Sequence, residues 1–408
     1  MPAEPSYVIV GASLAGAKAA ETLREEGFGG RVVLIGGEAE RPYERPPLSK
    51  GYLLGKEDRS VVYVHDEGWY AGHDVDLRLG ASVTGIDPAA RTVSIADGET
   101  VGYDRLLLTT GSVPRRLDVP GSHLDGVHYL RILADSERLA AALRGGGRAV
   151  VVGAGWIGLE TAAAAREYGC DVTVVEMGAG ALLQAIGPEL GSVFGELHHD
   201  HGVTLRFAEE VREIQGAAGR VSGVVTSAGA RLPADFVIVG IGARPSVGIA
   251  TASGLVVDNG IVADQALRTS APDIFAAGDV ANSFSPLLGR RVRVEHWANA
   301  LNGGPAAARS MLGKAVVYDP VPYFYSDQYE LGMEMAGLPQ PGGYDRVVYR
   351  GDRDGLEFIA FWLAGGAVVA GMNVNVWDVT DDIQALIRSA RPIDPARLTD
   401  PDIPLTDV

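Results

Sequence analysis

Two segments of the chain share one pattern of apolar and polar positions. In each, a short run rich in β-branched residues (residues 7–10 and 148–152) leads into a glycine-rich turn and then an alanine-rich stretch of helical length. Another apolar run, at residues 31–35 or 171–175, follows each alanine-rich stretch. Apolar runs of this length on either side of a helix predict neighbouring parallel strands. The pattern therefore predicts the same strand–helix–strand unit twice, about 140 residues apart.

The pattern changes beyond residue 240. Residues 274–279 predict a short buried strand that ends in a glycine turn. From about residue 321 apolar and polar residues alternate, which is typical of antiparallel strands, and a helix and an irregular tail follow. We therefore predict an α/β protein with two Rossmann-like dinucleotide-binding domains and a C-terminal α+β domain. The C-terminal elements are expected as strands over 344–350, 356–363 and 367–373, a helix over 379–389, and the irregular tail from Pro392.

Composition narrows the class of protein. The 408 residues contain 54 glycines without a collagen-like period, so we expect the glycines in turns and at close backbone approaches. With 35 Lys and Arg against 52 Asp and Glu, the net charge of −17 argues against nucleic-acid binding. The apolar stretch 149–165 contains three glycines and Glu160, and residues 1–11 lack the basic and apolar regions of a secretory signal. We expect a cytoplasmic protein that binds neither membranes nor nucleic acid.

The sequence contains a single cysteine, Cys170. One cysteine excludes an intramolecular disulfide, a CxxC redox pair and a cysteine-rich metal site. Cys170 stands directly before an apolar run, so we expect an inert buried thiol. We predict no metal site.

The second glycine turn has the full G-x-G-x-x-G spacing, with Gly153, Gly155 and Gly158 between a predicted strand and a predicted helix. In this motif the first glycine permits the tight turn, the second lets the backbone approach a pyrophosphate, and the third lets helix and strand pack closely. The N-terminus of the helix then offers free N–H groups to the phosphates. Glu176, 18 residues past Gly158, is placed to bond ribose hydroxyls, and residues 177–180 contain no Arg or Lys for a 2′-phosphate. We therefore predict NADH as the ligand.

The first glycine turn departs from this spacing because Ser13 stands between Gly11 and Gly16 in place of the middle glycine. The serine side chain is small, and its hydroxyl can donate a hydrogen bond to a phosphate or a water. Gly37 and Glu38 both lie near the end of the following strand, and we favour Glu38, 22 residues after Gly16, because its side chain can bond a ribose. Two such sites in one chain indicate electron transfer between two dinucleotides, such as FAD and NAD(P)H.

Residues 42–50, Pro-Tyr-Glu-Arg-Pro-Pro-Leu-Ser-Lys, resemble a signature of the FAD-dependent ferredoxin reductases, P-Y-x-R-P-x-L-S-K. These reductases serve bacterial cytochrome P450 and Rieske oxygenase systems. The resemblance continues in order over nearly the whole chain. Its further matches are TTG at 109–111, Arg131, TSAPDIFAAGD at 269–279, EHWANA at 295–300, SDQY at 326–329 and RPIDPARL at 391–398.

The resemblance implies a glutathione-reductase-like architecture. An FAD-binding domain would comprise residues 1–115 and 245–320, an NADH-binding domain residues 116–244, and a C-terminal interface domain residues 321–408. By position in the family motifs, the FAD contacts would be Gly11, Ser13, Ala15, Gly16, Glu38, Arg45, Lys50, Val83, Arg131, Asp279 and Trp297. The NADH contacts would be Gly153, Gly155, Ile157, Gly158, Glu160, Glu176 and Gly242.

Several of these residues receive a role from the resemblance. Lys50 would lie near the flavin N5 edge and form an ion pair with Glu160 where the hydride arrives, which makes these two the candidate catalytic residues. Asp279 would accept a hydrogen bond from a ribityl hydroxyl. Arg45 and Arg131 offer planar cations for stacking or for phosphate bonding.

The resemblance implies that NADH reduces FAD and that FAD passes single electrons to a small [2Fe–2S] ferredoxin. Disulfide reductases pass electrons through a cysteine beside the flavin, but residues 45–50 contain none, so electrons must leave the flavin directly. Two alternatives stay open. One is a flavin NADH oxidoreductase with a small-molecule acceptor of the quinone or monodehydroascorbate type. The other is a non-enzymatic flavoprotein resembling apoptosis-inducing factor, although no extended basic region suited to DNA is present.

We expect a local basic patch to dock the ferredoxin, because screening limits the reach of the overall negative charge to roughly 8–10 Å at physiological salt. The expected docking residues are Arg290, Arg291, Arg293 and Tyr325, extended by Arg309 and Lys314. The family commonly has Trp at the position of Tyr325, near the exposed edge of the flavin.

We expect the protein to be a monomer or a weak homodimer.

Overall fold

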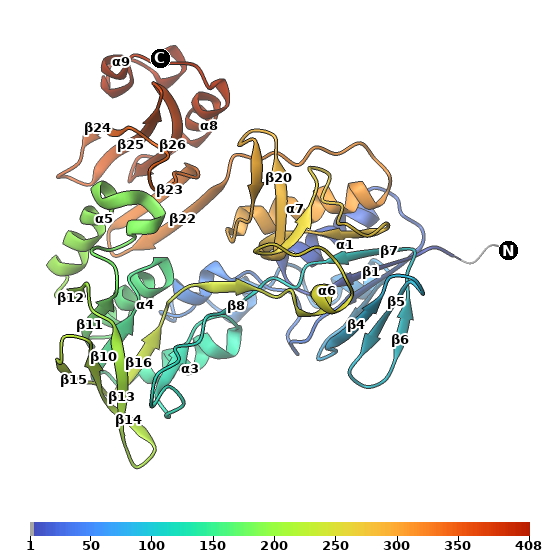
Figure 1. Ribbon diagram of the computed structural model, residues 1–408, viewed down its shortest axis with the longest axis horizontal. Coiled ribbons are helices and arrows are strands. Elements are labelled where there is room, and N and C mark those ends of the chain that lie inside the picture. The colour runs from blue at the N-terminus through green and yellow to red at the C-terminus, as the bar shows by residue number, and fades with distance from the viewer. Residues whose placement is uncertain (1–3) are drawn as a thin grey trace. The chain divides into compact units, whose positions relative to one another are not determined.

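The computed structural model describes residues 4–408 and divides the chain into two compact units (Figure 1). The first unit comprises residues up to 44, 59–113 and 244–322, and the second comprises 45–58, 114–243 and 323–408. Residues 1–3, which belong to the N-terminal stretch without a predicted secretory signal, lie outside the described residues.

A five-stranded parallel sheet forms the centre of the first unit. Its strands lie in the order β19-β7-β1-β2-β3, so the carboxyl ends of all five strands meet at one edge. Ile9, Leu34 and Leu107 are completely buried in its core. The strands are β1 (Ser6–Val10), β2 (Arg31–Ile35), β3 (Val75–Arg78), β7 (Arg105–Leu108) and β19 (Ile274–Ala276).

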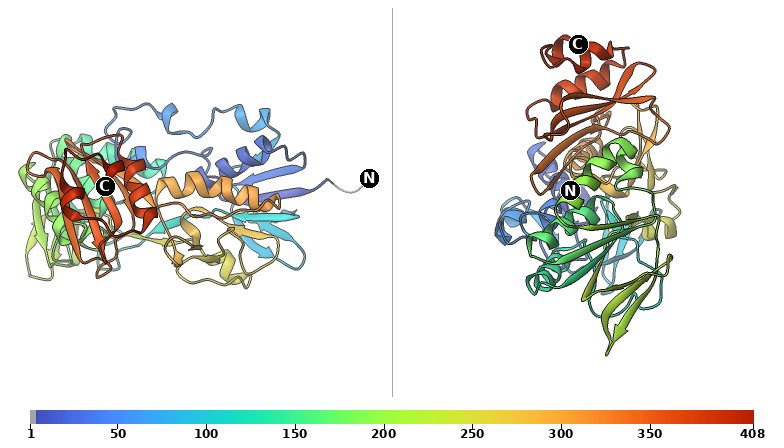
Figure 2. Two further views of the ribbon diagram at one scale, coloured as in Figure 1. Left: turned by 90° about the horizontal axis from the view of Figure 1, so that it is seen from above. Right: turned by 90° about the vertical axis from the view of Figure 1, so that its left-hand side faces the viewer.

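The helices α1 (Leu14–Glu25) and α7 (Trp297–Met311) pack against each other in this unit, as Figure 2 shows in blue and orange. Their backbones approach closely, because a Cβ atom on Gly304 of α7 would lie 2.2 Å from the carbonyl oxygen of Ala15 in α1. The remaining elements are β4 (Val83–Asp87), β5 (Thr92–Ile95), β6 (Thr100–Gly102), β18 (Ile261–Ala263), β20 (Ala281–Ser285), β21 (Arg290–Val292), α2 (Trp69–Gly72), α6 (Gly248–Ala252), η2 (Arg59–Val62) and η3 (Gly278–Val280). A separate two-stranded sheet pairs β8 (Ser112–Pro114) with β17 (Ala243–Pro245).

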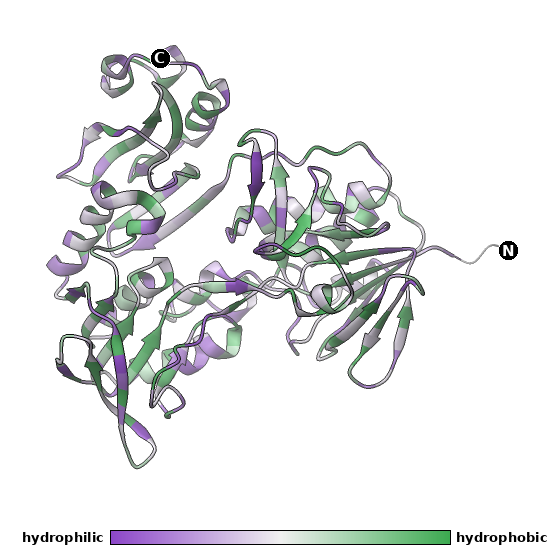
Figure 3. Ribbon diagram, viewed as in Figure 1, coloured by the Kyte–Doolittle hydropathy of each residue, from purple (hydrophilic) through white to green (hydrophobic). Residues whose placement is uncertain are grey.

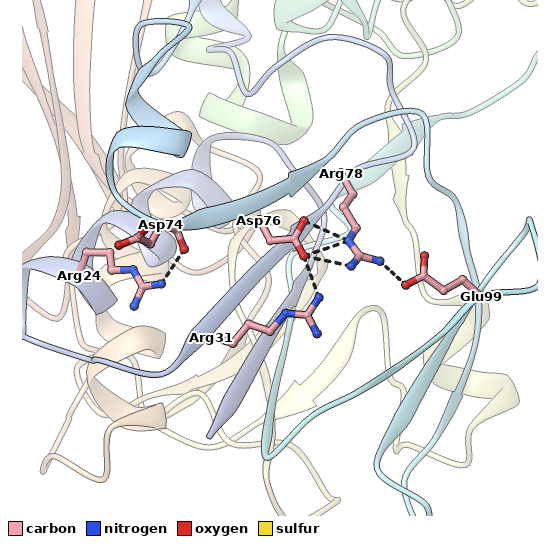
Figure 4. A network of polar contacts seen from close by, with 6 residues as sticks. All are labelled: Arg24, Arg31, Asp74, Asp76, Arg78 and Glu99. Atoms are coloured by element: carbon pink, nitrogen blue, oxygen red, sulfur yellow. Dashed lines mark hydrogen bonds and ion pairs between the residues drawn. The ribbon is translucent and has the colours of Figure 1, made fainter. Parts of the chain in front are cut away.

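A network of charged side chains joins the β2–β3 edge of this sheet to the small sheet β4-β5-β6 (Figure 4). Asp76 of β3 accepts hydrogen bonds from Arg31 of β2 at 2.8 Å and from Arg78, whose Nη1 also donates to Glu99 at 2.7 Å. Glu99 lies in the turn between β5 and β6. Because these side chains are partly exposed, each pair contributes only about 0.5 kcal/mol, so the network links the two sheets but adds little stability.

A second parallel sheet, in the order β12-β11-β10-β16-β9, forms the dinucleotide-binding part of the second unit. Its central strands are continuous apolar runs, and Figure 3 shows β16 in green. The elements are β9 (Val127–Tyr129), β10 (Arg148–Val152), β11 (Asp171–Glu176), β12 (Thr204–Phe207), β16 (Phe236–Val239), α3 (Leu133–Arg144), α4 (Trp156–Glu167), α5 (Leu183–Asp200), η1 (Pro46–Ser49) and the small antiparallel sheet β13 (Val211–Ala217), β14 (Arg220–Thr226) and β15 (Arg231–Pro233).

The C-terminal part of the second unit is an antiparallel sheet in the order β22-β23-β26-β25-β24. Phe358 and Trp362 are completely buried in a core that also contains Cys170 at 0% exposure. Burial raises the pKa of the Cys170 thiol, in keeping with an inert group. The elements are β22 (Tyr323–Gln328), β23 (Leu331–Gly337), β24 (Arg346–Asp352), β25 (Glu357–Ala364), β26 (Ala367–Val374), α8 (Thr380–Ser389), α9 (Pro395–Thr399) and η4 (Leu405–Asp407).

The predicted fold class is confirmed, with two parallel sheets of the Rossmann type and a C-terminal α+β part. The prediction of an irregular tail from Pro392 is wrong, because α9 begins at Pro395. Asp394 caps this helix by accepting a hydrogen bond from the Ala396 amide at 2.9 Å, and proline fits the first helical position because its missing N–H is not needed there.

Candidate functional site

The outer glycines of the first turn are required by the fold of the chain itself. Gly11 has a φ of +120°, and a Cβ atom at this position would lie 2.2 Å from the carbonyl oxygen of Thr109. A Cβ atom on Gly16 would lie 2.1 Å from the carbonyl oxygen of Gly11. Any side chain at either position would therefore force the β1–α1 turn apart.

Ser13 begins α1 in an extended conformation, with a φ of −129° that any residue can adopt. Its side chain forms no capping hydrogen bond, and the first turn of α1 contains no acidic residue. The helix thus presents its amide groups and the positive end of its dipole without a side-chain anion of its own. These features fit a bound pyrophosphate at this turn.

Other predicted FAD-site residues lie at or beside the same carboxyl edge of the first sheet. A Cβ atom on Gly278, which directly precedes Asp279, would lie 3.2 Å from the Ala15 Cβ atom, so η3 is adjacent to the start of α1. Asp279 Oδ2 accepts a hydrogen bond from Ser112 Oγ at 2.9 Å. Glu38, three residues after β2, accepts a hydrogen bond from the Tyr43 hydroxyl.

The remaining predicted FAD-site residues of the first unit are Val83 and Trp297. Val83 begins β4 at the margin of the buried core. Trp297 begins α7, and its Nε1 donates a hydrogen bond to Glu44 Oε2 at 2.9 Å. Burial lowers the pKa of the preceding His296 to about 4, so this imidazole is neutral near pH 7.

The second turn repeats the close contacts of the first. Gly153 has a φ of +100°, and a Cβ atom on it would lie 2.6 Å from the carbonyl oxygen of Gly240. A Cβ atom on Gly158 would lie 2.0 Å from the carbonyl oxygen of Gly153. Gly155 differs, because its φ is −81° and the nearest atom to an added Cβ lies 3.9 Å away. Protein packing therefore explains two of the three glycines, and the room left at Gly155 fits a ligand that approaches the backbone.

Glu176 ends β11 with its carboxylate against the second glycine turn. Its Oε2 accepts a hydrogen bond from the Ala154 amide at 2.7 Å, and its Oε1 accepts one from the Gly178 amide at 2.6 Å. Gly242 follows β16 at the same edge with a φ of +93°. Ile157 is 41% exposed in the first turn of α4, which has neither a side-chain cap nor an acidic residue. This edge combines a carboxylate for ribose hydroxyls with a free helix N-terminus for phosphates.

The predicted ion pair between Lys50 and Glu160 is present within the second unit. Lys50 Nζ lies 2.8 Å from Glu160 Oε1, and the two side chains are 15% and 4% exposed. Ser326 Oγ also donates to Oε1 at 2.7 Å, and Ser49 Oγ donates to Oε2. Lys50 Nζ additionally lies 5.4 Å from the centre of the Tyr325 ring. Glu160 stands on α4 two residues after Gly158, so a buried, fully hydrogen-bonded carboxylate adjoins the second glycine turn.

Arg45 and Arg131 belong to the second unit, together with Lys50, whereas the other predicted FAD contacts belong to the first. Arg131 lies two residues after β9, at the carboxyl edge that also carries Gly153 and Gly242. Arg45 donates a hydrogen bond to the Arg131 carbonyl group. The sequence predicts that Arg45 and Arg131 both contact FAD, but it did not predict the hydrogen bond between them.

The basic residues that we expect to dock a ferredoxin differ in exposure and in their ion pairs. Arg290 and Arg291 are exposed on β21. Arg293 is only 10% exposed and forms an ion pair with Glu295. Arg309 and Lys314 both pair with Glu26, which neutralises part of their charge. Of these five basic residues, Arg290 and Arg291 are therefore the best placed to attract an acidic partner, and docking there stays a prediction.

A hydrogen-bonded set of buried side chains near Glu160 was missed by the sequence analysis. It comprises Ser49, Ser326, Gln328 and His198. The family match SDQY at 326–329 contains two of these residues, Ser326 and Gln328, but the sequence analysis assigned neither of them a function.

Among residues 4–408 no group of three or more His, Cys, Asp or Glu side chains could hold a metal ion. In the same range, no helix has the length and apolar character needed to cross a membrane.

Two family models match the chain. Residues 5–304 match pyridine nucleotide-disulphide oxidoreductase, and residues 323–408 match the reductase C-terminal domain. The chain is 41% identical over 406 residues to the ferredoxin–NAD(+) reductase component of the anthranilate 1,2-dioxygenase system of Burkholderia cepacia, with 99% of each chain covered. It is 38% identical over 413 residues to putidaredoxin reductase of Pseudomonas putida, with 100% of this chain and 97% of that protein covered.

Solved structures of ferredoxin reductases also match this chain over nearly its whole length. The covalent putidaredoxin reductase–putidaredoxin complex matches with a TM-score of 0.95 at 37% identity, covering 99% of this chain and 98% of the other. A ferredoxin reductase from Rhodopseudomonas palustris matches with a TM-score of 0.95 at 36% identity, covering 98% of each chain. The resemblance stated from the sequence is thus confirmed over its whole length.

Proposed function

Because the chain belongs to the pyridine nucleotide-disulphide oxidoreductase family and carries a reductase C-terminal domain, we propose that it is an NADH-dependent flavoprotein reductase that transfers electrons to a small [2Fe–2S] ferredoxin. The ferredoxin would feed a cytochrome P450 or a Rieske oxygenase. One relative, covered over 99% of its length, is named as the ferredoxin–NAD(+) reductase component of a dioxygenase system, which supports the proposal. Another, covered over 97% of its length, is named as a putidaredoxin reductase. A cytoplasmic location stays a prediction.

The observation that carries the proposal is the combination of two glycine turns with the absence of a usable thiol. The sequence contains one cysteine, and Cys170 is completely buried in the core of the second unit. Reduction of a disulfide substrate through the protein needs a pair of accessible thiols, which this chain does not have. A flavin held by this chain would therefore have to pass its electrons on without a protein thiol, as transfer to an iron–sulfur protein requires.

The first turn would hold FAD. Gly11 and Gly16 shape the turn, Ser13 and Ala15 lie at the start of α1 for the pyrophosphate, and Glu38 would bond the adenosine ribose. Asp279 would accept a hydrogen bond from the ribityl chain, with Val83 and Trp297 lining the site. When bound, FAD accepts a hydride and releases electrons one at a time. That Arg45, Lys50 and Arg131 also contact FAD stays a prediction.

The second turn would hold NADH. Gly155 leaves room for the pyrophosphate, the start of α4 at Ile157 offers free amides, and Glu176 accepts from the ribose hydroxyls. The Glu176 carboxylate repels a 2′-phosphate, so NADH is favoured over NADPH. Glu160 lies two residues beyond Gly158, and its ion pair with Lys50 would orient the nicotinamide end, because a buried ion pair is fixed in direction and excludes water.

Stopped-flow reduction of the purified protein tests the proposal. We expect rapid bleaching of the flavin absorbance by NADH and much slower bleaching by NADPH. Adding a [2Fe–2S] ferredoxin should reoxidise the flavin as the cluster spectrum changes. Reduction of quinone or monodehydroascorbate, with no transfer to any of several [2Fe–2S] ferredoxins, would instead support a small-molecule acceptor.

Ferredoxin docking at Arg290 and Arg291 is testable separately, because both side chains are exposed on β21. Reversing both charges (R290E and R291E) should raise the KM for ferredoxin about tenfold, since opposite charges steer association. The rate with NADH and ferricyanide should stay unchanged. Equal losses in both assays would place the effect on the enzyme itself and contradict docking at this strand.

A further inference from the structure

A chain of buried hydrogen bonds leads from Glu160 into the C-terminal part of the second unit. Ser326 Oγ donates to Glu160 Oε1 at 2.7 Å, and Gln328 Nε2 donates to Ser326 Oγ at 3.1 Å. Gln328 Oε1 lies 2.8 Å from His198 Nε2, and His198 Nδ1 lies 3.4 Å from the Tyr329 hydroxyl. We call Ser326, Gln328 and His198 the β22 polar chain, since two of its members stand on one face of β22.

The β22 polar chain has a single direction. Burial lowers the pKa of His198 to about 4, so its ring is neutral near pH 7 and carries one N–H. Gln328 Oε1 can only accept, so the proton is on His198 Nε2, and Nδ1 accepts from Tyr329. Every donor in the chain therefore points toward the Glu160 carboxylate. Aligned hydrogen bonds polarise one another, and they strengthen the last bond to the carboxylate.

Gln328, in the middle of the β22 polar chain, excludes a role for this chain as a proton relay. A proton relay needs groups that can accept a proton on one side and release it on the other, as hydroxyl and imidazole groups do. The amide of Gln328 does not do so near neutral pH. The chain therefore acts by holding the position and charge of Glu160, and it does not conduct protons.

We propose that Ser326, Gln328 and His198 are positioning residues that hold the Glu160 carboxylate against Lys50 for hydride transfer from NADH. The inference rests on the proposed function only in taking the Lys50–Glu160 pair as part of the NADH site. Lys50 and Ser326 share Glu160 Oε1, while Ser49 holds Oε2, so the carboxylate is fixed at both oxygens. Removing Ser326 from this set would let the carboxylate rotate away from Lys50.

This assignment gives the C-terminal part of the chain a role in the chemistry of NADH. Two of the three positioning residues lie in residues 323–408, the part that matches the reductase C-terminal domain. His198 lies on α5 of the dinucleotide-binding part. The β22 polar chain therefore couples the placement of β22 to the geometry of Glu160 inside one unit.

Gln328→Glu tests the direction of the chain with nearly unchanged side-chain volume. A carboxylate at 328 can only accept, so the Ser326 hydroxyl would turn toward it and away from Glu160. We expect the flavin-reduction rate at saturating NADH to fall about tenfold at pH 8, with little change in the KM for NADH. As the pH falls and the new carboxyl group protonates, it regains a donor, so the rate should recover toward wild type near pH 5.5.

Ser326→Ala and Tyr323→Phe complete the experiment. Ser326→Ala should lose a similar factor without any recovery at low pH. Tyr323→Phe removes a hydrogen bond from the same strand to Glu334 at 2.7 Å, outside the β22 polar chain, and should leave the rate unchanged. The wild-type pH profile serves as the reference, because several other ionisable groups lie around position 328. They are His198 on α5, His201 directly after it, Glu160, Arg166 and Glu167 on α4, Lys50 after η1, Asp327 on β22, and Tyr329 and Glu330 in the following turn.

The outcomes separate the inference from the function it rests on. Wild-type rates at every pH in both Gln328→Glu and Ser326→Ala would overturn the positioning role. A full rate in Glu160→Gln would instead remove Glu160 from the NADH site, and slow reduction of the wild-type flavin by NADH would contradict the proposed function itself. If Gln328→Glu fails to fold, as judged by flavin content and melting temperature, the loss in Ser326→Ala decides the question.

Discussion

The two glycine turns differ at one position, and the difference separates the demands of folding from those of binding. In both turns the outer glycines, Gly11 and Gly16 or Gly153 and Gly158, would force a Cβ atom to within 2.6 Å of a backbone carbonyl oxygen. The middle position accepts Ser13 in the first turn and has open space at Gly155 in the second. The outer glycines are thus fixed by the chain, and the middle residue is free to follow the ligand.

The acids that accompany the turns differ in a second way. Glu176 is held by two backbone amides, one of them inside the glycine turn, whereas Glu38 is held by a tyrosine hydroxyl. Backbone amides fix the Glu176 carboxylate before any ligand arrives. Such preorganisation suits a dinucleotide that enters and leaves in every turnover, as we propose for NADH.

Alanine at the last glycine of each turn should have the largest effect. Gly158→Ala places a Cβ atom 2.0 Å from a backbone oxygen in the second turn, and Gly16→Ala places one 2.1 Å away in the first. We expect Gly158→Ala to keep its flavin but to lose NADH-driven reduction by at least about 100-fold. Gly16→Ala should instead lose flavin, which the ratio of absorbance at about 450 nm to that at about 280 nm measures. The reference is the wild-type protein, for which we expect on the order of one FAD per chain. Gly195→Ala, in α5 with its nearest neighbour at 3.9 Å, is the control and should match wild type.

Each unit also contains a histidine whose pKa is strongly lowered by burial, His296 in the first and His198 in the second, so acid should destabilise both units. Burial lowers the pKa of His198 and of His296 to about 4, below the value of about 6.5 in the unfolded chain. The unfolded state therefore binds more protons between these pH values, so stability falls as the pH drops from about 6.5 to about 4. Each histidine accounts for about 2–3 kcal/mol of this loss. Melting temperatures of His198→Gln and His296→Gln across this range should show a weaker pH dependence than wild type, and an unchanged slope would contradict the assignment.

Much of the fold around the two glycine turns could be predicted from the sequence, because it depends on local backbone geometry. The glycine turns and the apolar strands β1 and β10 are determined by residues close in the chain. The Lys50–Glu160 pair came from the resemblance of a motif, since 110 positions separate the two residues. The link from Gln328 to His198 depends on how β22 packs against α5, which no local pattern contains. The capping of α9 by Asp394 was local and could have been predicted from the Asp-Pro pair.

Removing the charge of one acid at a time should sharpen the comparison of the two sites. Glu176→Gln keeps an acceptor for the Ala154 amide but no longer repels a 2′-phosphate. We expect the preference for NADH over NADPH, measured as a ratio of kcat/KM values, to fall about tenfold. Glu38→Gln should leave this ratio unchanged and weaken only the retention of FAD. A shift in coenzyme preference in Glu38→Gln would contradict the assignment of the two turns.

Exchanging the middle residues should have the smallest effect. In Gly155→Ser the new Cβ atom would lie 3.9 Å from its nearest neighbour, the Gly240 carbonyl oxygen, so stability should change by less than about 0.5 kcal/mol while the KM for NADH rises about threefold to tenfold. Ser13→Gly removes no capping hydrogen bond and should cost only a few tenths of a kcal/mol. Calorimetry and NADH titration check both variants. A large loss of stability in Gly155→Ser would show that packing, rather than a ligand, selects glycine there.

Stopped-flow absorbance of the purified flavoprotein, mixed with NADH in the presence of a [2Fe–2S] ferredoxin, tests the central claim most directly. The account predicts that the flavin is reduced in one NADH-dependent step and that two ferredoxin clusters are then reduced for each NADH consumed. An intact flavin that NADH does not reduce, or a reduced flavin that delivers no electrons to ferredoxin, would contradict it.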